Sequence, residues 1–462
     1  MKSKSDLKVY FGLIFLFLEM YLLFSGVISH LDEIYISGWP NYSETMDHSL
    51  KLIDLFYSDP IKDMYYILFV APISVLNEKS IEQEPTLIDL PYKEEILMTH
   101  PEILLFNSTE FNQSSAKLLR FSDYNILYIL YDGFFSFLFS NDVVKINICF
   151  LIAIFFLAFS SYLLMYNESK SVFLSIVISN SFVISNYIFF NFTMSDENLI
   201  TVFPTVFFLF FLEKIRRNPG KSRWYIFSAI AFSLQFLVST QLSLILLYLI
   251  LFREILLLPK KYSILRIIRW KKLLIPFMIF FLLSFPQILI SYANMLLLEN
   301  SPLNDYDYFV SSIRGASFTS ASDLFSFYSP QSLSLSTWIL TFFMIIFSIA
   351  NKRWQYPVLI SLITLFCFGF ADWNIPYLLF SKLPLFSAFR VTKRFVVFIP
   401  LFNFAELVNI MEEKKSGKPF VMERFFSSKY IIILFLLFLI FDIVYCINSP
   451  YIGQDVFFDP YI

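Results

Sequence analysis

Three clusters of charged residues have types and spacings that suit chemistry, and the first lies near the N-terminus. Asp32 and Glu33 follow an apolar stretch, and Asp47 and His48 come shortly after them. A carboxylate at a boundary between apolar surroundings and water can act as a general base or a metal ligand, because partial burial changes its pKa. The alternative is that Asp32 and Glu33 only solvate the end of a helix.

The second cluster is the short acidic stretch Ser195-Asp196-Glu197-Asn198, which separates two apolar segments. Because the stretch is short, Asp196 must lie close to the ends of those segments. Acidic side chains are also favourable at helix N-termini, where the helix dipole is positive. Helix capping is therefore the alternative to a functional role for Asp196.

The third cluster is basic and opens a late apolar segment. Lys382, Arg390, Lys393 and Arg394 lie close together along the chain. Arginine can hold phosphate oxygens through two parallel hydrogen bonds, so this pattern suits a lipid phosphate or a pyrophosphate. The alternative is that these side chains extend along apolar surface towards water, or pair with nearby acids.

Motifs for nucleotides, metals and redox chemistry give no support to those functions. The chain contains no GxGxxG, P-loop, HExxH or CxxC pattern. Cys149, Cys367 and Cys446 all lie inside apolar runs, so we expect neither a disulfide framework nor a structural zinc site. A divalent cation is the one cofactor left open, and no ligand set is assigned to it.

The composition indicates a membrane protein. Hydrophobic residues make up 57% of the 462 residues and charged residues 16%, whereas soluble domains typically have about 45–50% and about 25%. The mean hydropathy is +0.65. These values argue against a soluble enzyme, a nucleic-acid-binding protein and a fibrous protein, and they predict an all-α polytopic membrane protein.

Apolar runs predict about eleven transmembrane helices, because a spanning helix needs about 20 mostly apolar residues. The first run is long for a signal peptide and no small-residue cleavage site follows it, so we expect a retained span. The predicted spans are 9–29, 144–165, 171–191, 198–213, two helices within 224–254, 273–295, 334–350, 355–371, 393–411 and 430–448.

The run 224–254 needs a decision between one span and two. It is long for one helix, and Ser239, Thr240 and Gln241 lie in its middle. Both flanks are rich in Lys and Arg, which prefer the cytoplasmic side of a membrane. A hairpin that turns at these three residues keeps both basic flanks on one side, so we predict two short helices.

This topology predicts a plasma or inner membrane protein with a cytoplasmic N-terminus and an extracytoplasmic C-terminus. We expect a single membrane domain over residues 1–462, with spans 2–7 in 144–295 and spans 8–11 in 334–448. The external parts are a first loop, a second loop and a tail, at 30–143, 296–333 and 449–462. Two runs in the first loop, 64–76 and 124–140, are short for spans and predict helices lying on the membrane surface.

Further charged residues extend the list of candidates. Asp47, His48 and Arg314, all in external loops, are secondary site candidates. Glu19 and Glu406 lie within predicted spans, where acids suggest function, but each also suits a polar contact between helices, so neither is given a catalytic role. The basic cluster is external and thus locally violates the positive-inside rule, which calls for an anionic partner.

With these residues in view, the chain resembles integral-membrane glycosyltransferases of the C-type (GT-C) fold, which use lipid-phosphate-linked sugars. Asp32-Glu33 after a first span, followed by a long loop, is similar to the arrangement in protein O-mannosyltransferases and aminoarabinose transferases. The stretch FTMSDENLITVFPTVFFLFFLEKIRR resembles the second acidic turn of that family. The stretch PLFSAFRVTKRF resembles a segment of YfhO-like membrane proteins.

The resemblance implies a mechanism at the extracytoplasmic face. A polyprenyl-phosphate sugar would enter from the bilayer, and Arg390, Lys393 and Arg394 would stabilise its phosphate leaving group. Asp32, with Glu33 beside it, would deprotonate the acceptor, a glycan, lipid or protein. Asp196, or alternatively Asp47, would position a substrate or a divalent cation.

Other functions stay open on the sequence alone. The loop lacks the Lys-Pro-Pro-type segment of many such transferases, and no large soluble domain follows the last predicted span. One alternative is a catalytically degenerate GT-C-like subunit that binds membrane-protein partners. Another is an enzyme like an O-antigen polymerase or ligase, although these usually place their largest external loop late in the chain. A transporter is disfavoured because no internal repeat is evident.

Overall fold

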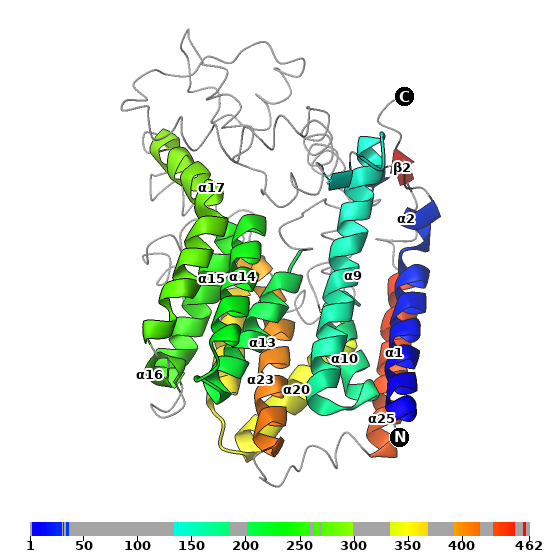
Figure 1. The fold of residues 1–462 in the computed structure, drawn as a ribbon. Helices are drawn as coiled ribbons and strands as arrows, with labels where there is room; N and C mark the ends of the chain where they lie inside the picture. The colour runs from blue at the N-terminus through cyan, green and yellow to red at the C-terminus, as the bar shows by residue number, and fades with distance from the viewer. Residues whose placement is uncertain are drawn as a thin grey trace.

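The computed structural model is a bundle of helices with one short pair of strands, which confirms the all-α class (Figure 1). The structure describes residues 2–29, 31, 34–36, 134–135, 137–184, 201–257, 263–267, 270–298, 333–367, 392–415, 428–448 and 456–458.

The helices have the following bounds. The first half contains α1 (Lys2–Leu23), α2 (Ser25–Ser29), α9 (Asp142–Ser169), α10 (Val172–Val183), α13 (Phe203–Arg217), α14 (Ser222–Val238) and α15 (Thr240–Phe252). The second half contains η3 (Arg253–Leu257), α16 (Ile264–Ile267), η4 (Trp270–Lys272), α17 (Leu274–Leu298), α20 (Leu335–Ala350), α21 (Gln355–Cys367), η7 (Thr392–Val397), α23 (Phe398–Lys415) and α25 (Lys429–Asn448).

A pair of three-residue strands joins the two ends of the chain. Strand β1 (Ile34–Ile36) runs antiparallel to β2 (Val456–Phe458), with Tyr35 opposite Phe457. The sequence analysis did not predict this pair, because three residues are too few to show the alternating pattern of a strand.

A described helix overlaps each predicted span, and two described helical segments are long and apolar enough to cross a membrane. These are Val144–Ser169 and Thr240–Leu257. Six further apolar helices among the described residues are shorter: Val172–Val183, Leu274–Leu289, Leu335–Ala350, Gln355–Cys367, Phe395–Met411 and Tyr430–Tyr445. The count of eleven membrane crossings therefore stays a prediction.

Contacts between helix termini divide the bundle into two ends. At one end, Lys214 near the C-terminus of α13 pairs with Glu168 near the C-terminus of α9, at 2.6 Å. Arg217 of α13 donates a hydrogen bond to Asn409, late in α23. We call this the ion-pair end, which lies at the bottom of Figure 1, and the opposite end, where β1 pairs with β2, the strand end.

The chain reverses at Ser239, as the predicted hairpin requires. Gln235, near the end of α14, accepts a hydrogen bond from Thr205, near the start of α13, so these two helices are antiparallel. Helix α14 has 17 residues and is thus about 25 Å long. Glu254, just after α15, nevertheless lies 2.5 Å from Arg216 at the end of α13, so α15 must return to the ion-pair end.

Helix α23 forms the centre of the bundle, because apolar residues on all its sides are buried. Phe398, Phe402 and Phe404 are each at most 2% exposed, and α23 contacts α9, α13, α20 and α21. By contrast, α1, α17 and α25 each present an exposed row of large apolar side chains. Helices α1 and α25 lie together at one edge (Figure 1).

Candidate functional site

Most of the residues predicted to carry chemistry lie outside the part of the chain that the structure describes. These are Asp32, Glu33, Asp47, His48, Asp196, Arg314 and Arg390. Lys393 and Arg394 belong to η7, of which the backbone at these two positions is described. The predicted surface helix 64–76 is also outside the described residues, as is most of 124–140. The flanking elements show where each segment leaves the bundle.

The Asp32-Glu33 segment is bounded on both sides by described contacts at the strand end. Just before it, the Leu31 carbonyl accepts a hydrogen bond of 2.9 Å from the Asn147 side chain, near the N-terminus of α9. Just after it, Ile34 lies opposite Phe458 in the strand pair. Asn147 is 6% exposed, so this anchor is well shielded from solvent.

The segment that contains Asp196 starts and ends level with the middle of α9: Ser179 of α10 donates a hydrogen bond of 2.7 Å to the Ala158 carbonyl, and the ring centroids of Phe203 and Phe156 lie 5.5 Å apart. Helix α10 begins next to the C-terminus of α9, at the ion-pair end, and runs away from it to Val183. Helix α13 begins at Phe203 and ends at the ion-pair end. The chain therefore leaves α10 and enters α13 near the middle of the bundle, on the side away from the ion-pair end.

The backbone of Lys393 and Arg394 lies on the strand-end side of α23. Asn409, late in α23, contacts Arg217 at the ion-pair end, and η7 precedes α23 without a break. Phe395 of η7 packs against Phe366, near the C-terminus of α21, with ring centroids 5.0 Å apart. The described flanks of all three predicted clusters thus lie away from the ion-pair end, and those of Asp32-Glu33 lie at the strand pair.

Buried polar contacts also join helices in the interior. Glu19 of α1, 5% exposed, accepts a hydrogen bond of 3.0 Å from Asn180 of α10. Among the described residues, the second Glu19 carboxylate oxygen has no hydrogen-bond partner. Asp442 of α25 accepts from the backbone N–H groups of Leu335 and Ser336 and so caps α20. Glu19 therefore forms the contact between helices that the sequence analysis considered.

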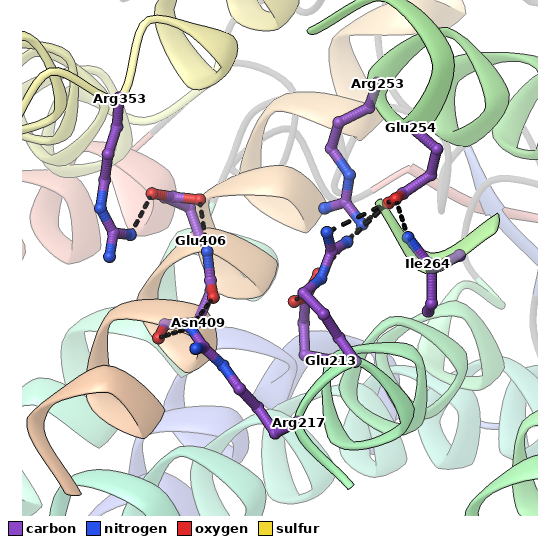
Figure 2. Close-up of polar contacts among 9 residues, drawn as sticks. Glu213, Arg217, Arg253, Glu254, Ile264, Arg353, Glu406 and Asn409 are labelled. Carbon is purple, nitrogen blue, oxygen red and sulfur yellow. Dashed lines mark hydrogen bonds and ion pairs between the residues drawn. The ribbon is translucent and has the colours of Figure 1, made fainter. Parts of the chain in front are cut away.

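The ion-pair end holds a buried cluster of two carboxylates and two guanidinium groups (Figure 2). Glu254 lies 2.5 Å from Arg216 and 3.0 Å from Arg253, and it accepts a hydrogen bond from the backbone N–H of Ile264 at 2.8 Å. Glu213 lies 2.9 Å from Arg216 and 3.0 Å from Arg253. Burial alone lowers the pKa of Arg216, but Glu213 and Glu254 more than offset it and hold that pKa above its ordinary value.

A second chain of contacts crosses the same end. Arg353, just before α21, lies 2.8 Å from Glu406 of α23. Asn409 donates to Glu406 and accepts from Arg217 (Figure 2). Glu406 thus joins α23 to α21, so its role is the contact between helices that was one of its two expected roles.

The described carboxylates of the ion-pair end all form ion pairs with Lys or Arg side chains, so this arrangement holds neighbouring helices together. The sequence analysis treated Arg216 and Arg253 only as part of the two basic flanks and missed their partners Glu213 and Glu254. The available signal was an acid inside each basic run, Glu213-Lys214 and Arg253-Glu254.

The half of the bundle away from the ion-pair end is therefore the candidate functional site, because the described flanks of all three predicted clusters lie in it. Within the described residues, no group of three or more His, Cys, Asp and Glu side chains could hold a metal ion. Scanned against protein-family models, curated proteins and solved structures, the chain finds no match.

Proposed function

We propose that the chain is an integral-membrane glycosyltransferase that moves a sugar from a polyprenyl-phosphate donor to an acceptor on the extracytoplasmic face. The observation that carries this proposal is that the described flanks of the three predicted clusters lie in the same half of the bundle. The elements that flank Asp32-Glu33, Asp196 and the Lys393-Arg394 pair all lie in the half of the bundle away from the ion-pair end. A general base, a positioning acid and a phosphate-binding group need such a common face to act on one substrate.

In this proposal each cluster has one task. Asp32, assisted by Glu33, removes the proton of the acceptor hydroxyl. Arg390, Lys393 and Arg394 stabilise the charge that develops on the departing lipid phosphate, and such stabilisation is often the largest part of catalysis. Asp196 positions a substrate or a divalent cation.

Membrane insertion is part of the proposal and has its own support. Two described helical segments are long and apolar enough to span a bilayer, and the rows of exposed apolar side chains on α1, α17 and α25 suit contact with lipid chains. The strand end then faces the extracytoplasmic side, and the ion-pair end faces the cytoplasm.

The first test is binding of a polyprenyl phosphate to the purified, detergent-solubilised full chain. The variant Arg390→Ala/Arg394→Ala removes two cations of the basic cluster. Hydrogen bonds to charged groups contribute about 1.5–3 kcal/mol each, so we expect the double variant to bind at least a hundredfold more weakly, on the order of 3 kcal/mol.

The matched control is Lys8→Ala/Lys352→Ala, which removes two exposed cations at the ion-pair end. Its affinity for the polyprenyl phosphate should equal that of the wild type. An equal loss of affinity in both double variants would show that the effect comes from net charge alone. No binding to the wild type would refute the donor class and favour a catalytically degenerate subunit.

A further inference from the structure

The exposed charged side chains of the described residues all have the same sign and lie near the same end of the bundle. The described side chains of Asp and Glu are all buried. The exposed charged side chains that the structure describes are cations near the ion-pair end: Lys8, Lys170, Lys221, Arg223, Lys271 and Lys352. The described part of that end thus presents positive charge to its surroundings, while its described acids are ion-paired in the interior.

Four cations form a compact patch where two turns meet. Lys221 and Arg223 lie at the start of α14, and Lys271 and Lys272 lie just before α17. The Lys272 ammonium donates to the Gly220 carbonyl and so ties the two turns together. We call Lys221, Arg223, Lys271 and Lys272 the basic patch.

An aromatic ring lies next to the basic patch, and there is open space beside it. The Arg223 guanidinium lies over the Trp224 ring, 4.3 Å from its centre, which orients the cation. A Cβ added at Gly220 would meet no atom within 4 Å, so the turn has free space beside it. Trp side chains with cations next to them are typical of membrane–water interfaces.

Apolar surface begins directly beside the basic patch on both helices. On α17, Leu274, Ile275 and Phe277 are at least 60% exposed. On α14, Phe227 is exposed one turn after Arg223. A partner that fits this surface has an anionic head next to apolar chains.

We propose that the basic patch binds the headgroup of an anionic phospholipid, with the acyl chains lying along α14 and α17. The assignment rests on the membrane placement in the proposed function but not on sugar transfer. The phosphate diester pairs with Lys221, Arg223 and Lys271, and the exposed apolar residues of α17 contact the acyl chains.

The test measures binding of phosphatidylglycerol to the detergent-solubilised full chain by native mass spectrometry, with phosphatidylcholine as the neutral lipid. The patch variant is Lys221→Gln/Arg223→Gln/Lys271→Gln. Each Lys or Arg near an anionic surface contributes about fivefold in affinity, so we expect a loss of about a hundredfold for phosphatidylglycerol. Binding of phosphatidylcholine should not change.

The matched control variant is Lys8→Gln/Lys170→Gln/Lys352→Gln, which removes the same charge from the same end. It should keep its affinity for phosphatidylglycerol within about threefold of the wild type, since its cations lie outside the basic patch. Equal losses in the two variants would overturn a local site in favour of diffuse attraction. Displacement of the lipid by inorganic phosphate would instead indicate a site for free phosphate.

A measurement on the wild type alone gives a second check that needs no variant. Binding through charge must weaken as salt increases, whereas binding through acyl chains alone does not. An affinity for phosphatidylglycerol that equals that for phosphatidylcholine at low salt would overturn the proposal. Neither result depends on the sugar donor, so failure of the transferase proposal would leave this test unaffected.

Discussion

Glu254 offers the sharpest test of the buried cluster at the ion-pair end. It is 2% exposed and accepts from Arg216, Arg253 and the Ile264 backbone. Breaking a buried ion pair by removing one partner costs about 3–5 kcal/mol. Because Glu213 stays close to both guanidinium groups, we expect Glu254→Gln to lower the free energy of unfolding by about 3 kcal/mol, at the lower end of that range.

Glu254→Ala should cost more than Glu254→Gln, because alanine leaves the Ile264 N–H without its acceptor, a loss of about 1–3 kcal/mol. The assay is equilibrium unfolding in mixed detergent micelles, with Lys221→Gln as a control that removes one exposed charge from the same end. The control should change stability by less than about 0.5 kcal/mol. A Glu254→Gln protein as stable as that control would refute the reasoning.

Two further predictions concern α1 and the segment that follows it. A Cβ at Gly12 would overlap the Tyr162 side chain of α9, so Gly12→Ala should destabilise the protein by about 1–3 kcal/mol in thermal unfolding. The double variant Gly12→Ala/Tyr162→Ala should lose less stability than the sum of the two single variants. Full additivity would contradict this contact. Asn147→Ala removes the hydrogen bond to Leu31, so backbone amides of residues 31–36 should exchange hydrogen faster while those of α23 stay unchanged. Unchanged exchange at 31–36 would show that the strand pair alone holds this segment.

The longer helices were predictable because each one is an apolar run in the sequence, and one reversal of the chain was predictable from the basic residues on both sides of a run. The reversal at Ser239 is the clearest example. Polar residues in the middle of one apolar run, with basic residues on both sides, predicted a turn. The structure confirms it, because Glu254 contacts Arg216.

The buried ion pairs could not be predicted, because each one depends on which helices become neighbours. Glu254 and Arg216 are separated by the whole α14–α15 hairpin, and nothing in the local sequence of either residue identifies its partner. The rule that basic residues prefer the cytoplasmic side treats every Lys and Arg alike. It therefore could not separate buried Arg216 from exposed Lys221.

The residues of the candidate site were predictable from the sequence, but the contacts that hold their segments in place were not. Asp32, Asp196 and Arg394 were selected by residue type and position in the sequence. The role of Asn147 was not foreseen, because an Asn inside an apolar run gives no sign that it binds the Leu31 carbonyl. Such contacts across the bundle depend on helix packing, which one sequence pattern does not encode.

The strand pair also has a consequence for the order of folding. Strand β1 leaves the ribosome before nearly all the helices, whereas its partner β2 follows α25 and is made after every one of them. During synthesis the residues next to Asp32 therefore lack this pairing until α25 and β2 have been made. Pairing of such distant segments is slow to form, because a long loop must close first. The Asp32-Glu33 segment thus gains the support of the strand pair only at the end of biosynthesis, after the helices have been made.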